Sequence, residues 1–208
     1  RQLALDFGDA PALYGTQLAA NGARHYPAGP KLGAARDIEL DGGSPSQEDG
    51  SDEDGVTFGA LQVGANAASV TVNVQDAPSG ARLDAWIDFD ADGLFSSADE
   101  RIAASLAVIE GDNVVTFAIP PTMLPGVAYA RFRLSTIGNL GSVGGAPDGE
   151  VEDYAVAIEP AGDEGGVFAP KQTINPSSTG SIVIAVNFDR DGDVDVLAAG
   201  TTVDWYDN

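Results

Sequence analysis

The sequence predicts an all-β protein: an antiparallel β-sandwich with long acidic loops, followed by a small C-terminal β-unit. Apolar and polar residues alternate in short segments such as Val70–Val74, Val115–Ile119 and Ala128–Leu134. A period of two is typical of strands with one buried face, and these segments recur at intervals of roughly 10–20 residues between Gly- and Pro-rich breaks. No segment has a convincing helical stripe, although a short helix would fit near residues 99–107.

The sandwich is expected to occupy residues 1–159. Residues 1–55 are rich in turn-forming residues, and the run Glu48–Gly55 holds five carboxylates in eight residues. Such a run is either a solvated loop or a segment that folds around a cation. The strands expected after it are 70–74, 83–89, 115–119, 128–134 and 154–158. The glycine-rich run 138–149 lacks the lysine of a phosphate-binding loop, so we expect a flexible surface loop there.

Residues 160–167 have the Gly-, Pro- and acid-rich composition of a linker. The remaining segment, 168–208, predicts strands at 182–186, 196–199 and 203–206, separated by an acidic loop and a turn. About 40 residues is the size of one propeller blade. One blade cannot bury both of its faces, so we expect this unit to dock on the sandwich, pair with another chain or begin a longer array.

Composition excludes several classes of partner. Asp and Glu outnumber Lys and Arg 32 to 10, which gives a net charge of −22. This charge argues against nucleic acid and anionic membrane surfaces, because both are bound through Lys and Arg. No apolar run is long enough to insert in a membrane. The chain has no cysteine, so in a secreted protein metal ions could replace disulfides as staples.

The first candidate metal site follows the strand expected at 83–89. Acidic residues stand at alternate positions, a glycine comes next, and two more acids follow. Calcium takes about six to eight oxygen ligands, and a loop that curls around the ion turns every second side chain inward. The other interpretation is an acidic turn in water. The candidate ligands are Asp88, Asp90, Asp92, the carbonyl of Leu94, Asp99 and Glu100.

The acidic loop of the C-terminal unit has the same spacing. Side chains with oxygen atoms fall at every second position around Gly192. We expect a second calcium ion here, more weakly held because the first position is an uncharged asparagine. A plain acidic turn is again the alternative. The candidate ligands are Asn187, Asp189, Asp191, Asp193 and Asp195.

Two family resemblances follow from these motifs. Residues 6–158 resemble the GEVED domain of large bacterial surface and secreted proteins, through the landmarks Asp6–Pro11, Asp52–Val56, Ala85–Phe89, Ala130–Arg133 and Gly149–Tyr154. Residues 168–208 resemble one FG-GAP/VCBS repeat, through Asn187–Asp195 and Trp205–Asn208. In that second family the acidic loop binds calcium. The resemblances imply a secreted, extracellular or cell-surface module without enzymatic activity.

The separated landmarks of the sandwich all carry acids, which would repel one another if they converged without a cation. We therefore consider an additional calcium site in the sandwich. The alternative is that these acids cap turns or pair with Arg131 and Arg133. The candidate residues are Asp6, Asp9, Asp52, Asp54, Glu150, Glu152 and Asp153.

Catalysis is not expected. His25 is the single histidine and there is no cysteine, so a nucleophilic triad or a zinc site lacks partners. A glycosidase needs a sugar cleft, and aromatic residues are few. We expect a calcium-binding structural or adhesion module that contacts calcium ions and a surface glycan or protein. The alternatives are a self-assembling filament or sheath subunit, joined to neighbouring copies by strand addition through either terminal segment, and a carbohydrate-binding accessory module.

Overall fold

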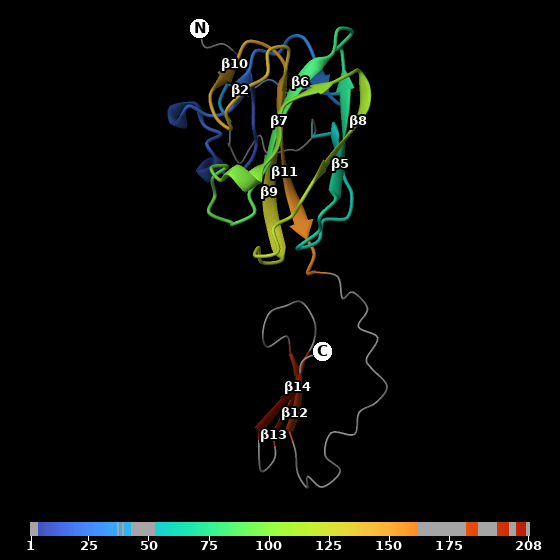
Figure 1. The fold of residues 1–208 in the computed structure, drawn as a ribbon. Coiled ribbons are helices and arrows are strands. Elements are labelled where there is room, and N and C mark those ends of the chain that lie inside the picture. The colour runs from blue at the N-terminus through green and yellow to red at the C-terminus, as the bar shows by residue number, and fades with distance from the viewer. Residues whose placement is uncertain are drawn as a thin grey trace. The chain divides into compact units, whose positions relative to one another are not determined.

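The computed structural model describes residues 4–36, 38, 40–42, 53–161, 182–186, 195–199 and 203–206, with only the backbone described in the last three ranges. The chain divides into two compact units, Arg1–Pro160 and Ala161–Asn208. The division falls at the start of the segment whose composition predicts a linker. The first unit is a β-sandwich and the second is a small sheet, so the all-β fold class is confirmed (Figure 1).

Two sheets form the sandwich. In the first, all neighbours are antiparallel and the order is β11 (Glu150–Ile158), β9 (Gly126–Ser135), β6 (Ala81–Ile87) and β7 (Arg101–Val108). The second sheet is built on β5 (Ala68–Gln75), which pairs with β3 (Lys31–Leu32), β4 (Val56–Phe58) and β8 (Gly111–Phe117). Strand β8 pairs with one edge of β5, and β3 and β4 pair with different parts of its other edge.

A third, small sheet joins distant segments. It consists of β1 (Asp6–Phe7), β2 (Arg24–His25) and β10 (Gly145–Ala146). Single 3-10 turns occur at Ala12–Tyr14 (η1), Leu18–Ala20 (η2) and Ala98–Glu100 (η3). The helix expected near residues 99–107 is therefore wrong. That segment continues from η3 into strand β7, because its backbone pairs with β6 from Ala81↔Val108 to Trp86↔Arg101.

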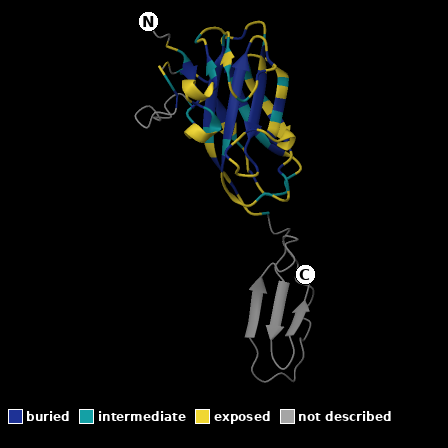
Figure 2. Cartoon of the chain, turned by 90° about the vertical axis from the view of Figure 1, so that its left-hand side faces the viewer, coloured by how far each residue is buried: buried dark blue, intermediate teal, exposed yellow. Residues whose placement is uncertain are grey.

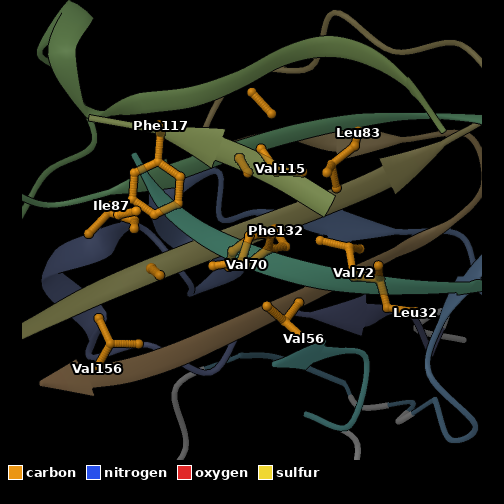
Figure 3. Close-up of a cluster of buried hydrophobic side chains, with 14 of the residues drawn as sticks. Leu32, Val56, Val70, Val72, Leu83, Ile87, Val115, Phe117, Phe132 and Val156 are labelled. Atoms are coloured by element: carbon orange, nitrogen blue, oxygen red, sulfur yellow. The ribbon is translucent and has the colours of Figure 1, made fainter. Parts of the chain in front are cut away.

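The core lies between the two large sheets, where the alternating residues of each sheet meet (Figures 2 and 3). Val70 and Val72 of β5 are almost fully buried against residues such as Leu83 of β6 and Phe132 of β9. Each of these side chains contributes roughly 1.5–3 kcal/mol by leaving water. The period-two pattern of the sequence thus identifies the buried face of each strand correctly.

The opposite face of β9 buries two arginines. Arg131 is fully buried, and its Nε and Nη2 atoms donate to the two carboxylate oxygens of Asp153 at 2.7 and 2.6 Å. Arg133 is equally buried, but its Nε donates to His25 Nε2 at 3.0 Å and its Nη atoms donate to backbone carbonyls. Those carbonyls belong to Arg24, Gly141, Val143 and Gly144. Segment 138–149 is at least partly exposed at most of its positions, as expected of a surface loop, and these bonds hold it against β9.

The second unit is a three-stranded antiparallel sheet in the order β12 (Ile182–Val186), β13 (Asp195–Ala199) and β14 (Val203–Tyr206). The strands expected at 182–186, 196–199 and 203–206 are confirmed, with β13 starting one residue earlier.

The substitution Asp153→Asn tests the buried ion pair. It removes the countercharge of Arg131 and leaves a buried guanidinium uncompensated, which typically costs about 3–5 kcal/mol. We expect urea denaturation to show a loss of this size in the free energy of unfolding. Asp112→Asn is the matched control, because Asp112 is exposed and surface substitutions cost about 0.5 kcal/mol or less. Equal effects of the two substitutions would contradict the structural role of the pair.

Candidate metal centre

Four carboxylates converge in the loop between β6 and β7. Oxygen atoms of Asp88, Asp90, Asp92 and Glu100 lie within 4.8 Å of one another. Asp88 immediately follows β6, and its amide donates to the Tyr129 carbonyl of β9 at 2.9 Å. Glu100 closes the group from the end of η3. The strand end and the 3-10 turn thus bring together side chains that are up to twelve residues apart in the sequence.

The sequence left Asp99 and Glu100 as alternatives for the late acid, and the structure selects Glu100. Asp99 is exposed and stands outside the four-carboxylate group, whereas Glu100 is only 1% exposed. The two residues are adjacent in a 3-10 turn, so their side chains point in different directions. The remaining candidate of this loop, Leu94, follows the turn directly, and its amide donates to Asp92 Oδ1 at 2.7 Å.

Side-chain to backbone hydrogen bonds set the curl of the loop. The Asp92 amide donates to Asp90 Oδ1 at 3.1 Å, and the Gly93 amide donates to Asp88 Oδ2 at 3.0 Å. Gly93 has φ +81°, a left-handed conformation that glycine adopts without a Cβ penalty. Aspartates therefore both shape this loop and line its interior, because their short side chains reach the backbone two residues away.

Two of the four carboxylates are buried with an oxygen atom that lacks a donor. Oδ2 of Asp88 accepts from the Tyr14 hydroxyl at 2.7 Å and from Gly93, and Oε2 of Glu100 accepts from the Ser97 amide at 2.8 Å. Within the described part of the chain, no group donates to Asp88 Oδ1 or Glu100 Oε1. A buried oxygen without a partner costs about 1–3 kcal/mol. A hard cation among the four carboxylates would satisfy both atoms, so the residues present fit calcium.

The shifted pKa values of the loop also favour a bound cation. Burial raises the pKa of Glu100 from 4.5 to about 7, and repulsion by Asp90, Asp88 and Asp92 adds to this shift, while the Ser97 amide opposes it. Burial, together with the hydrogen bond to Asp88, also raises the pKa of the Tyr14 hydroxyl. Without an ion, the repulsion among the four carboxylates therefore lowers the stability of the folded loop.

Aromatic packing fixes the loop to the N-terminal segment. The ring of Tyr14 lies 5.1 Å from the ring of Phe95 and 4.9 Å from that of Tyr129, measured between centroids. The Arg131 guanidinium lies 5.3 Å from the centroid of Phe95. The four-carboxylate loop, η1 and β9 thus share one cluster. Sequence spacing could not reveal the role of Tyr14, because it is separated from Asp88 by 74 residues.

The acids of the additional sandwich site accept hydrogen bonds from backbone amides. Glu150 Oε2 accepts from the Leu32 amide, and Glu152 Oε1 accepts from the amides of Asp54 and Gly55 at 3.2 and 3.0 Å. These bonds tie β11 to β3 and β4 of the other sheet. Burial raises the pKa of Glu152 to about 8, against the lowering effect of its hydrogen-bond donors.

Two further acids of that set have similar partners. Asp6 Oδ2 accepts from the Val151 amide at 2.7 Å. Asp153 binds Arg131 as described above, and its Oδ2 also accepts from the Ala10 amide at 2.8 Å. The interpretation that these acids cap backbone groups or pair with arginine therefore describes their contacts.

The last members of the set are spread apart. Asp54 Oδ1 accepts from the Ala34 amide at 2.8 Å. Asp9 lines a shallow pocket with Glu53 and Tyr129, and Asp52 lies outside the described residues. Among the residues that the structure describes, these acids do not gather to within 4.8 Å of one another as the four carboxylates of the β6–β7 loop do.

The second calcium loop falls largely outside the described residues. Asn187, Asp189, Asp191 and Asp193 are not described, and only the backbone of Asp195 is, as the first residue of β13. Calcium binding by this loop stays a prediction.

Residues 82–157 match the family model of the GEVED domain. The GEVED match runs from β6 to β11, so it contains the whole four-carboxylate loop and the motif Gly149–Tyr154. It supports the GEVED part of the resemblance, and it does not extend to the landmarks before residue 82 or to the FG-GAP/VCBS-like segment 168–208. A search of curated proteins found no match, and a search of solved structures found none either. None of the helices in the described part of the chain has the length and apolar character needed to span a bilayer.

The substitution Gly93→Ala tests the shape of the loop. A Cβ at Gly93 would lie 2.1 Å from Leu13 Cδ2, in addition to the cost of about 1–2 kcal/mol for a side chain at positive φ. Gly111→Ala is the matched control, because its φ is +95° and no atom lies within 4 Å of its ideal Cβ. We expect Gly93→Ala to lower the melting temperature more than the control does and to weaken calcium binding, which Gly111→Ala leaves unchanged. Equal losses of stability and unchanged calcium affinity would contradict this geometry.

The raised pKa of Glu100 predicts a pH dependence in metal-free protein. Because the folded-state pKa lies above the unfolded value, stability from the neutral acid is present at low pH and is lost as pH rises from about 4.5 to about 7. Glu100→Gln removes this titration and keeps an oxygen for the Ser97 amide. In EGTA we expect similar melting temperatures for the two proteins at pH 5, and a higher one for Glu100→Gln at pH 8. A constant difference across this range would refute the assignment.

Proposed function

We propose that this protein is a calcium-stabilised structural or adhesion module that works outside the cell. The observation that carries the proposal is the pair of buried oxygens, Asp88 Oδ1 and Glu100 Oε1, which lack donors beside two further carboxylates. Asp88 and Glu100 accept from backbone amides through their other oxygens, as the remaining buried acids do, but they alone lie in a described group of four carboxylates within 4.8 Å. This loop instead offers a concentrated set of oxygen ligands, the arrangement that hard cations require.

Calcium would act here as a staple. The four carboxylates repel one another in the empty loop, and an ion converts this repulsion into attraction. Extracellular calcium modules bind with dissociation constants of about 0.1–1 mM. An ion present at about 100 times its dissociation constant adds roughly 2.7 kcal/mol to stability, a large part of the total for an ordinary domain. The hydrogen bond from Tyr14 to Asp88 would extend this effect to the N-terminal segment.

Three further features support this proposal. Bacterial surface and secreted proteins are the setting of the GEVED resemblance, and the family match covers residues 82–157. The chain lacks cysteine, so metal ions would take the place of disulfides. His25 is fully buried, accepts from Arg133 at Nε2 and donates from Nδ1 to the Asp148 carbonyl. Burial also lowers its pKa, which suits a structural role for the single histidine.

A self-assembling filament subunit is the second candidate. Strand β8 pairs with β5 along its length, and in the described part of the chain its other edge has no partner strand. Val114 on this strand is 68% exposed. Open edges of this kind accept a strand from a neighbouring chain. Filaments in electron micrographs of the calcium-loaded protein would favour this candidate, and monodisperse particles would count against it.

Calcium titration with paired variants tests the proposed function. We expect calorimetry to detect calcium binding, and we expect EGTA to lower the melting temperature until calcium is restored. Asp90→Asn removes a member of the four-carboxylate group and should weaken binding at least about tenfold, the equivalent of about 1.4 kcal/mol. Asp99→Asn is the control, because it removes the same charge from the same loop outside the group.

An intact second calcium loop would add a separate binding event, so the titration is also run on Asp189→Asn. The proposal fails if calcium neither binds nor shifts the melting temperature, or if Asp90→Asn and Asp99→Asn behave alike.

A further inference from the structure

Three members of the four-carboxylate group line a pocket whose other lining residues are largely apolar. The pocket has a volume of about 370 Å³. Asp88, Asp90 and Glu100 line it together with Asp99 and Ser97. The remaining lining comes from the segment before β9 and from its first residues, including Pro120, Met123, Leu124, Val127 and Ala128. An ion held by the carboxylates would therefore face a pocket with an aliphatic wall.

One oxygen of each of the four carboxylates already accepts a hydrogen bond from a backbone amide of the loop. The other four oxygens, together with the Leu94 carbonyl that the sequence suggests, would fill five positions around a calcium ion. Calcium takes about six to eight. The remaining positions point to water or to a ligand in the pocket. A site with an open position of this kind can bind a ligand oxygen directly, in place of water.

Charge decides which ligand fits. The four carboxylates outweigh the two positive charges of calcium, and Asp99 adds another negative charge at the rim. No lysine or arginine is among the described residues that line the pocket. A ligand carboxylate or phosphate would therefore be repelled. A neutral hydroxyl suits the site better, because its oxygen can coordinate the ion while its proton is donated to one of the carboxylates.

We propose that this pocket binds a neutral saccharide, with two adjacent hydroxyls on the calcium ion and the C–H face of the sugar ring against the aliphatic wall. Leu124 and Val127 are 84% and 68% exposed in the free protein, so they offer apolar surface at the pocket without any rearrangement of the core. A sugar ring provides both surfaces at once: hydroxyls on its edge and C–H groups on its face. This inference rests on the proposed calcium site and names the ligand of that same site.

The test separates the saccharide from the ion. Calcium binding is measured first by calorimetry, without sugar. The calcium-loaded protein is then applied to an array of neutral and anionic glycans, and titrated by NMR with methyl mannoside and methyl galactoside at up to about 50 mM. This range would detect a dissociation constant of about 1 mM. We expect binding to neutral glycans in calcium and none in EGTA.

Two matched variants test whether the apolar lining residues of the pocket contact the saccharide. Val127→Ala shortens a side chain in the pocket, and Val114→Ala makes the same change at a residue of equal exposure on β8. We expect Val127→Ala to weaken saccharide binding about tenfold, as for lost apolar contact in a binding pocket, with calcium affinity unchanged. Val114→Ala should alter neither measurement.

The proposal is overturned if calcium binds normally but no neutral glycan does, if binding survives EGTA, or if Val127→Ala has no effect on it. It is also overturned if an acidic peptide or an anionic glycan binds in place of neutral sugars. Those outcomes leave the calcium site standing. Failure of calcium binding in the first titration removes the proposed function itself, and the two failures are therefore distinguishable.

Discussion

A carboxylate taken out of water needs a positive partner or hydrogen-bond donors, and this requirement organises the sandwich. Among the described residues, seven acids are buried, on both faces of β11 and around β6, but only two arginines are buried with them. Backbone amides satisfy most of them: Glu150 binds Leu32, Glu152 binds Gly55, and Asp6 binds Val151. In the β6–β7 loop, Asp88 Oδ1 and Glu100 Oε1 have no hydrogen-bond donor among the described residues.

The same requirement explains the motif Gly149–Tyr154 residue by residue. Gly149 has φ +94°, and a Cβ there would lie 1.8 Å from the Leu134 carbonyl. Successive acids then project to opposite faces of β11, so that Glu152 reaches the second sheet while Asp153 reaches Arg131 and the N-terminal segment. Tyr154 completes the motif by donating to Glu152 and accepting from the Val56 amide. One strand thereby joins three layers of the unit.

Local patterns made much of this structure predictable. Alternation identified the core faces of β5, β8 and β9, and the spacing of Asp88, Asp90 and Asp92 identified the loop whose carboxylates converge. Long-range partners were not predictable, because nothing in the spacing of Tyr14 or Val127 refers to a loop dozens of residues away. Charge counting could not decide between an ion and a backbone amide as the partner of Glu150 and Glu152, because the amides that they bind lie far away in the sequence. Local sequence allowed a short helix near residues 99–107, whereas pairing with β6 makes residues 101–108 a strand.

The hydrogen bond between Tyr14 and Asp88 has a mechanical consequence. If the module is stretched from its ends, as the proposed surface role would entail, tension on the N-terminal segment would reach Tyr14. From there it would pass to Asp88 of the four-carboxylate loop and to the ring cluster with Phe95 and Tyr129. An occupied loop would lock this path, so the force at which the N-terminal segment peels away would rise and fall with the calcium content of the surroundings.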